Sequence, residues 1–113
     1  MTHHVAQAQG ELTMFTVDCR TTDELIAQRN APAPTLMKVD VEGWEYHVLN
    51  GAHDLLQSSR LKAIAIEAAC DPTGRLLDCR LESVLNDYGY RLSRIRRPEG
   101  EIRGVENYLA VRA

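Results

Sequence analysis

The stretch Thr35–Ala68, TLMKVDVEGWEYHVLNGAHDLLQSSRLKAIAIEA, contains the residues that decide the fold. Its first apolar run, 35–41, predicts a strand, and the lack of clean polar alternation is typical of strands covered on both faces of a parallel sheet. From Trp44 onward apolar residues recur at three- and four-residue steps, which predicts a helix that Gly51 bends or divides. The run 63–68 predicts a second buried strand.

Upstream of this stretch the chain predicts one strand and one helix. Residues 12–17 alternate loosely, which favours a strand. Thr21 with Glu24 three residues later forms a capping-box pattern that opens a helix through Gln28. Residues 1–11 are small and polar, so we expect a disordered tail there and a single domain over 12–113.

Downstream, the spacing of leucines over 76–85 predicts an amphipathic helix that ends near Gly89. Residues 90–95 and 107–111 favour two strands of an antiparallel hairpin. Strands and helices thus alternate along most of the chain. This order predicts an α/β sandwich with a mainly parallel sheet that ends in an antiparallel hairpin.

Composition excludes several classes of protein. The 113 residues carry a formal charge of −3, with 44% apolar and 26% charged residues, as in a soluble globular domain. No apolar run approaches the length of a membrane helix, so we expect no membrane partner. Two glutamates interrupt the arginine cluster of residues 91–103, which favours a solvated hairpin over a nucleic-acid surface. The cysteines show no CxxC spacing and the N-terminus no secretory pattern, so we expect a cytoplasmic protein with reduced thiols.

Acidic residues follow the two central strands. Asp40 and Glu42 come directly after the first strand, and Glu67 ends the second. Because ligands of open α/β sheets bind at the carboxyl ends of strands, these three acids are candidates for one site. They are suited to act as a general base or to hold Mg²⁺. Alternatively, Asp40 or Glu42 caps the following helix, and Glu67 pairs with a structural partner.

Four neighbours of these acids allow two interpretations each. Gly43 permits either a sharp turn or the close approach of a ligand. Trp44 either stacks on a planar ligand or packs in the core, and packing is the more common role. Glu45 in the first helical turn either stabilises the helix or belongs to the site, with helix stabilisation favoured. Lys38 more often pairs with an acid than takes part in catalysis.

The same stretch resembles the FkbM-type S-adenosylmethionine-dependent methyltransferases. In that family an apolar strand with Lys precedes D-V-E-G-x-E, a helix reading V-L-x-G-A and a strand ending in Glu. The similarity also covers VDCRTTDEL at 17–25 and the closing hairpin, and thus most of residues 15–112. The residues at matching central positions are Lys38, Asp40, Val41, Glu42, Gly43, Glu45, Val48, Leu49, Gly51, Ala52 and Glu67.

The resemblance implies a class I methyltransferase fold, a Rossmann-like three-layer sandwich. It implies methyl transfer from S-adenosylmethionine to a hydroxyl of an unidentified small molecule, with Asp40, Glu42 and Glu67 as catalytic residues. Asp40, Gly43 and Trp44 would contact the cofactor, and no residue is assigned to a metal. The family's first strands and glycine-rich cofactor loop have no counterpart in residues 1–14, so the chain resembles the C-terminal half of the domain, truncated naturally or as a fragment.

The strand at 35–41 would then present a bare edge, which is a template for pairing. We expect either a homodimer or a complementing chain at that edge, or the strand at 12–17 repositioned over it. Two further functions stay open beside weak or absent methyl transfer. One is a non-catalytic half-domain that acts as an oligomerisation or binding module, and the other is metal binding by the three acids.

Overall fold

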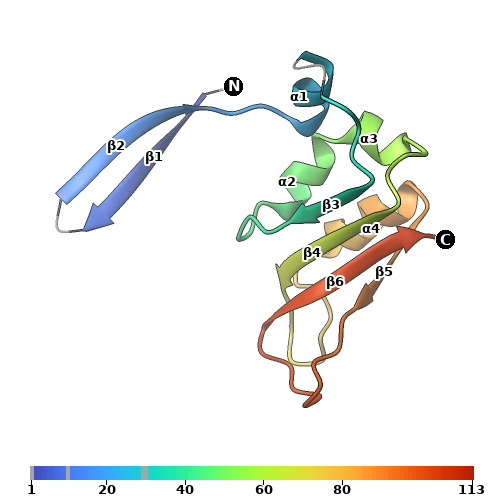
Figure 1. The fold of residues 1–113 in the computed structure, drawn as a ribbon. Helices are drawn as coiled ribbons and strands as arrows, with labels where there is room; N and C mark the ends of the chain where they lie inside the picture. Colours follow the sequence, from blue (N-terminus) through green and yellow to red (C-terminus); the bar gives the residue numbers. More distant parts are fainter. Residues whose placement is uncertain (1, 10, 29–30) are drawn as a thin grey trace.

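The computed structural model describes residues 2–9, 11–28 and 31–113, with side chains from Met14 onward. The strands β1 (Thr2–Gln9) and β2 (Glu11–Asp18) form an antiparallel hairpin. This hairpin extends away from the other elements as a separate two-stranded sheet (Figure 1). The strand expected at 12–17 is therefore present. Within the tail expected to be disordered at 1–11, Thr2–Gln9 forms a strand that supplies the backbone partner of β2, while residues 1 and 10 lie outside the described residues.

The main sheet contains four strands in the order β3-β4-β6-β5. They are β3 (Leu36–Val39), β4 (Ala63–Ala69), β5 (Tyr90–Arg94) and β6 (Val105–Arg112). The β3–β4 pair is parallel, and β6 is antiparallel to both of its neighbours. Three strands therefore run in one direction, but two of the three pairings are antiparallel. The predicted closing antiparallel hairpin is confirmed, whereas the expected mainly parallel sheet is mixed, because the reversed strand β6 lies inside the sheet and also pairs with β4.

Four helices complete the body: α1 (Thr22–Gln28), α2 (Glu45–Asn50), α3 (His53–Gln57) and α4 (Cys79–Asp87). The side chain of Thr21 accepts the N–H of Glu24 at 3.1 Å, as the capping pattern predicts. Gly51 separates α2 from α3. The last helix starts later than predicted because Leu76 forms a β-bridge with Cys70. In the described ranges, no helix has the length and apolar character to cross a membrane.

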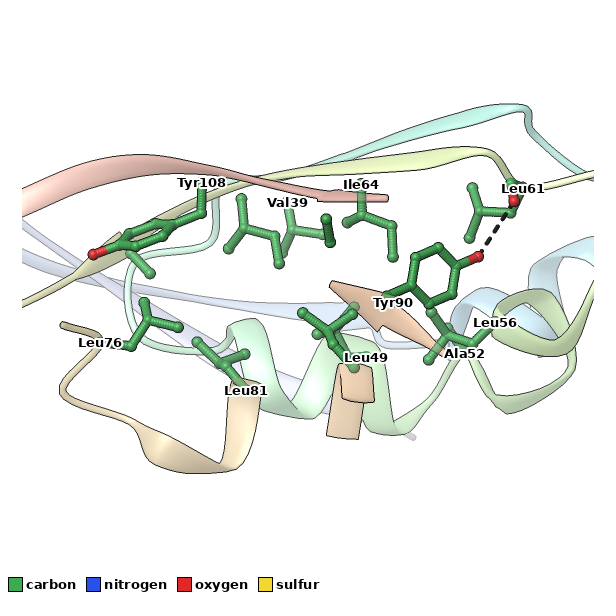
Figure 2. Packing of buried hydrophobic residues seen from close by; sticks show 14 of the residues in the cluster. Val39, Leu49, Ala52, Leu56, Leu61, Ile64, Leu76, Leu81, Tyr90 and Tyr108 are labelled. Carbon is green, nitrogen blue, oxygen red and sulfur yellow. Dashed lines mark hydrogen bonds between the residues drawn. The ribbon is translucent and has the colours of Figure 1, made fainter. Parts of the chain in front are cut away.

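The core lies between one face of the sheet and the helices (Figure 2). Along β4, Ile64, Ile66 and Ala68 are buried, whereas Ala63, Ala65 and Glu67 on the opposite face are only partly covered. The same alternation continues along β6. In the described residues the body therefore has two layers, and the expected three-layer sandwich is wrong. The third layer was implied by the family resemblance and by the apolar run at 35–41, but the exposed Lys38 and the half-buried Ala63 and Ala65 leave this face of the described sheet open.

The edge of β3 remains open within the described chain. β3 pairs with β4 on one side, and β2 pairs with β1 rather than with β3. The expected repositioning of strand 12–17 over this edge is thus wrong. Leu36 at the start of β3 is 62% exposed. A second chain at this edge stays a prediction.

An acid that the sequence analysis overlooked fixes the helices on the β3 side. The Asp23 carboxylate accepts the backbone N–H groups of Asp54 at 2.8 Å and Leu55 at 3.1 Å. The N–H of Asp23 itself donates to the Gly51 carbonyl at 3.2 Å. Asp23 thus caps α3 from a position thirty residues earlier in the chain, a contact that no local capping pattern shows.

Candidate functional site

A tight turn follows β3 and leads into α2. The N–H of Trp44 donates to the Val41 carbonyl at 3.3 Å. Glu42 has φ 46° and Gly43 has φ 101°, so two successive residues adopt positive φ. For Glu42, which carries a Cβ, this conformation costs about 1–2 kcal/mol. The turn therefore persists only because surrounding contacts hold it.

Glu45 supplies one of these contacts. Its side chain is 4% exposed, and a carboxylate oxygen accepts the N–H of Gly43 at 2.7 Å. This bond ties the first residue of α2 back to the strained turn. The interpretation of Glu45 as a structural residue at the helix start is therefore favoured, and the turn presents its other residues from a fixed backbone.

Asp40 and Glu67 stand side by side at the carboxyl ends of β3 and β4. The parallel register pairs Val39 with Ile66, so the next positions on each strand are Asp40 and Glu67. Across β4, Glu67 pairs with Asn107 of β6. Val39 and Ile66 point into the core, so alternation directs the two acids toward the open face of the sheet. The structure thus places a polar row at the rim where ligands of α/β sheets bind.

The structure also decides between the alternatives for these acids. Trp44 is the N-cap of α2 and no side chain caps this helix, so neither Asp40 nor Glu42 has that role. Within the described chain, no hydrogen bond or ion pair joins the side-chain carboxylate of Asp40, Glu42 or Glu67 to another residue. The structural partner expected for Glu67 is therefore not found there. Lys38 is exposed and forms no ion pair with the described acids.

The three acids do not form a metal site in the part of the chain that the structure describes. No group of three His, Cys, Asp or Glu residues suited to a metal ion occurs there. Glu42, in the exposed turn, is not in register with the other two acids. The metal-binding interpretation therefore lacks geometric support, and all three cysteines are free thiols.

Gly43 and Trp44 adjoin two different cavities. Gly43 lines a space of about 90 Å³ beside the end of β4 and the start of α4. Trp44 lines a cavity of about 400 Å³ on the α1 side, together with His47 and the linker residue Arg20. Trp44 is 56% exposed, so the interpretation of Trp44 as a core residue is wrong. The two residues assigned to the cofactor beside Asp40 therefore line different cavities, although they are adjacent in the chain.

A second acid is buried in the closing hairpin, where the sequence suggested only solvated charges. Glu106 is 1% exposed and lies 3.0 Å from Arg97 Nε and 3.9 Å from Arg94 Nη1. The N–H of Arg103 donates to it at 3.1 Å. Burial raises the pKa of Glu106, but the Arg103 N–H and the Arg97 guanidinium outweigh burial and hold this pKa below its ordinary value. This acid is structural.

Comparison with known proteins agrees with the sequence resemblance. Residues 2–92 match the methyltransferase FkbM domain. The hexuronic acid methyltransferase AglP of Haloferax volcanii is 38% identical over 69 residues, which cover 61% of this chain and 28% of that protein. No solved structure matches. Because the domain match covers most of the chain, this protein belongs to the FkbM methyltransferase family.

Proposed function

We propose that this chain forms part of an S-adenosylmethionine-dependent O-methyltransferase, with Asp40 and Glu67 at its reacting centre. One observation carries the proposal: in a member of this family, the parallel register ends at Val39 and Ile66, so the exposed Asp40 and the half-buried Glu67 follow it at the carboxyl rim of the sheet. The chain spans about a quarter of the length of its curated relative. The activity and acceptor of the whole protein are therefore part of the proposal.

Gly43 and Asp40, at the rim of the sheet, are suited to contact the cofactor. S-adenosylmethionine, when bound, supplies an electrophilic methyl group on a positively charged sulfur. Nothing lies within 4 Å of the position that a Cβ on Gly43 would occupy, so the backbone there leaves room for a ligand. The Asp40 carboxylate would attract the positive charge of the cofactor or bind its hydroxyls. Trp44 lines a different cavity, on the α1 side.

The two carboxylates suit transfer to a hydroxyl. Asp40 or Glu67 would accept the proton that the acceptor oxygen loses as it bonds to the methyl carbon, while the carbon–sulfur bond breaks and S-adenosylhomocysteine leaves. A positioned general base contributes about 10²–10⁴-fold to rate. The relative AglP acts on a hexuronic acid by its name. We therefore propose an acidic sugar as the acceptor class.

Two measurements test this proposal. Calorimetric titration with S-adenosylmethionine and S-adenosylhomocysteine, with and without Mg²⁺, reports cofactor binding, which we expect Gly43→Val to abolish. Mass spectrometry of methyl β-glucuronide incubated with the chain and S-adenosylmethionine reports methyl transfer. Asp40→Asn and Glu67→Gln should lower transfer at least about 100-fold, whereas Glu82→Gln on the exposed face of α4 should not. If the chain neither binds the cofactor nor transfers a methyl group, the proposed function is refuted for this chain.

The open edge of β3 favours a second candidate function, a non-catalytic half-domain that associates through this edge. An unpaired edge with an exposed apolar residue such as Leu36 is a template for strand addition by a second copy or a complementing chain. Such a module would assemble whether or not cofactor binds.

Sedimentation velocity tests this second candidate. We expect a concentration-dependent dimer that Leu36→Lys weakens, because a charge at the edge opposes pairing. Leu77→Lys is the matched control, since Leu77 is similarly exposed and lies outside the sheet. A chain that stays monomeric at all concentrations, with no partner captured at the edge, would contradict the module.

A further inference from the structure

A cavity of about 340 Å³ lies between the loop that follows β4, the helix α4 and the strand β5. The antiparallel register pairs Arg94 of β5 with Tyr108 of β6, and Tyr108 lies in the core (Figure 2). Because paired residues of neighbouring strands share a face, Arg94 also points to the helix-covered side of the sheet. Asp40 and Glu67 are directed toward the open side. The cavity is therefore separate from the proposed reacting centre.

Arg94 is a mostly buried cation whose hydrogen-bond donors are unused within the described chain. Its side chain is 20% exposed, and its one ion pair with a described residue is a 3.9 Å contact with Glu106. That carboxylate already has closer partners, Arg97 Nε at 3.0 Å and the N–H of Arg103 at 3.1 Å. In the described residues no buried side-chain nitrogen lacks a hydrogen-bond partner. The nitrogens of Arg94, which donate to none of these residues, are therefore accessible from the cavity that Arg94 lines.

A fixed turn sets the position of the Arg94 guanidinium. Gly74 has φ 89°, and a Cβ on it would lie 2.5 Å from Arg94 Nε, so glycine leaves the space that the guanidinium occupies. The Gly74 carbonyl accepts the Tyr108 hydroxyl at 2.7 Å. The Asp71 carboxylate accepts the N–H of Arg75 at 3.1 Å, which closes the turn. Arg94 is thus positioned before a ligand arrives, which lowers the entropy cost of binding.

The charges around the cavity favour one kind of ligand. Arg75 is exposed, lines the same cavity and forms no ion pair with a described residue. Two guanidinium groups around one cavity repel each other unless an anion lies between them. Since the exposed Glu82 also lines the cavity, its residues carry two positive charges and one negative charge. A singly charged carboxylate balances this excess, and it accepts two parallel hydrogen bonds from a guanidinium.

We propose that this cavity binds the carboxylate of a small polar acid, with Arg94 as the inner partner and Arg75 as the outer partner. The volume falls within the range of small-molecule sites, about 300–1,000 Å³. The proposal goes beyond the proposed function and does not depend on it, because neither arginine belongs to the Asp40–Glu67 pair. The ligand would be a molecule additional to the cofactor and the acceptor.

Nuclear magnetic resonance of the ¹⁵N-labelled chain tests the site, because the Nε–H signal of Arg94 reports on its guanidinium directly. The probes are glycolate, its neutral analogue glycolamide and the doubly charged sulfate, at constant ionic strength in slightly acidic buffer. We expect glycolate to shift the signal saturably, with a dissociation constant of about 10 mM or tighter. Glycolamide should cause no shift, and sulfate should bind at least about threefold more weakly than glycolate.

Variants locate the binding. Arg75→Gln, at an exposed residue without an ion pair to a described residue, should weaken glycolate binding at least about threefold and leave the fold intact. Arg94→Gln removes the Nε–H signal and thereby assigns it, and it should abolish the shift of the Gly74 amide. Arg91→Gln, at an exposed arginine of the same strand, is the matched control and should bind glycolate as the unaltered chain does. Circular dichroism checks that each variant is folded.

Several outcomes would overturn the proposal. Shifts that grow without saturation, or equal shifts with glycolamide, would mean that no carboxylate site exists. Glycolate binding that neither Arg75→Gln nor Arg94→Gln alters would mean that the anion binds elsewhere. Sulfate bound as tightly as glycolate would overturn the assignment to a carboxylate. Because the titration contains no S-adenosylmethionine, a chain without methyl transfer can still confirm this site, and a chain with methyl transfer can still refute it.

Discussion

Glu106 and Asp40 are both acids of the main sheet, yet their surroundings are opposite. Glu106 is buried on the helix-covered face and contacts Arg97, Arg94 and the backbone of Arg103. Asp40 lies exposed at the rim and, among the described residues, has no such contact. An acid whose charge is satisfied by arginines therefore serves stability, whereas an exposed acid beside a turn that Glu45 holds remains available to a ligand.

The largest effect on stability should follow removal of the buried charge. Glu106→Gln leaves the partly buried Arg94 and Arg97 without their counter-charge. We expect the unfolding temperature to fall by about 10 °C in differential scanning calorimetry. Glu99→Gln, which removes an exposed ion pair with Arg103, is the control and should change little. Equal effects of the two substitutions on the unfolding temperature would contradict the view that the buried charge of Glu106 stabilises the fold more than an exposed one.

The pH dependence of stability should identify Glu106 as ionised. Its pKa is lowered on folding, so its contribution is complete above its ordinary value of 4.5 and is lost as pH falls through the lower folded pKa. The difference in unfolding temperature between the wild-type chain and Glu106→Gln should therefore be constant near neutral pH and shrink below about pH 4.5. A difference that persists at low pH would show that charge is not the cause.

Asp23 should have an intermediate effect, because it satisfies backbone donors rather than charges. Asp23→Ala leaves the N–H groups of Asp54 and Leu55 without their acceptor. We expect a loss of about 1 kcal/mol in the free energy of unfolding, measured by urea denaturation. Asp23→Asn keeps one acceptor oxygen and should lose less. If Asp23→Ala leaves the free energy of unfolding unchanged, water replaces the carboxylate as the acceptor of these N–H groups.

The smallest effect on stability should come from the rim. Asp40→Asn should alter the free energy of unfolding by less than about 0.5 kcal/mol, as at other exposed positions. The same variant should reduce methyl transfer strongly, so stability and activity separate. A clear loss of stability in urea denaturation would place Asp40 with Glu106 among the structural acids.

Features that depend on local chemistry were predicted correctly from the sequence. The Thr21 cap, the division of the helix at Gly51 and the strand at Ala63–Ala69 each follow from residues close in the chain. The sequence resemblance also predicted the family, which the domain match confirms.

The incorrect predictions concern contacts between distant segments. The Asp23 cap on α3 joins residues about thirty positions apart, and neither end carries a local signature. Glu106 was overlooked because its burial depends on the register of β6 against its neighbours. The run at 63–68 predicted a buried strand, but only alternate residues of β4 are buried, and the third layer that the resemblance implied has no counterpart in the described chain.

The position of β6 has a consequence for synthesis. This strand is the last of the described sheet to leave the ribosome, yet it lies between β4 and β5. While β6 is still absent, β4 and β5 have no shared partner and Ile64 and Ile66 lack part of their cover. Nascent chains should therefore remain open to chaperones until Arg112 emerges, and the sheet closes in one late step.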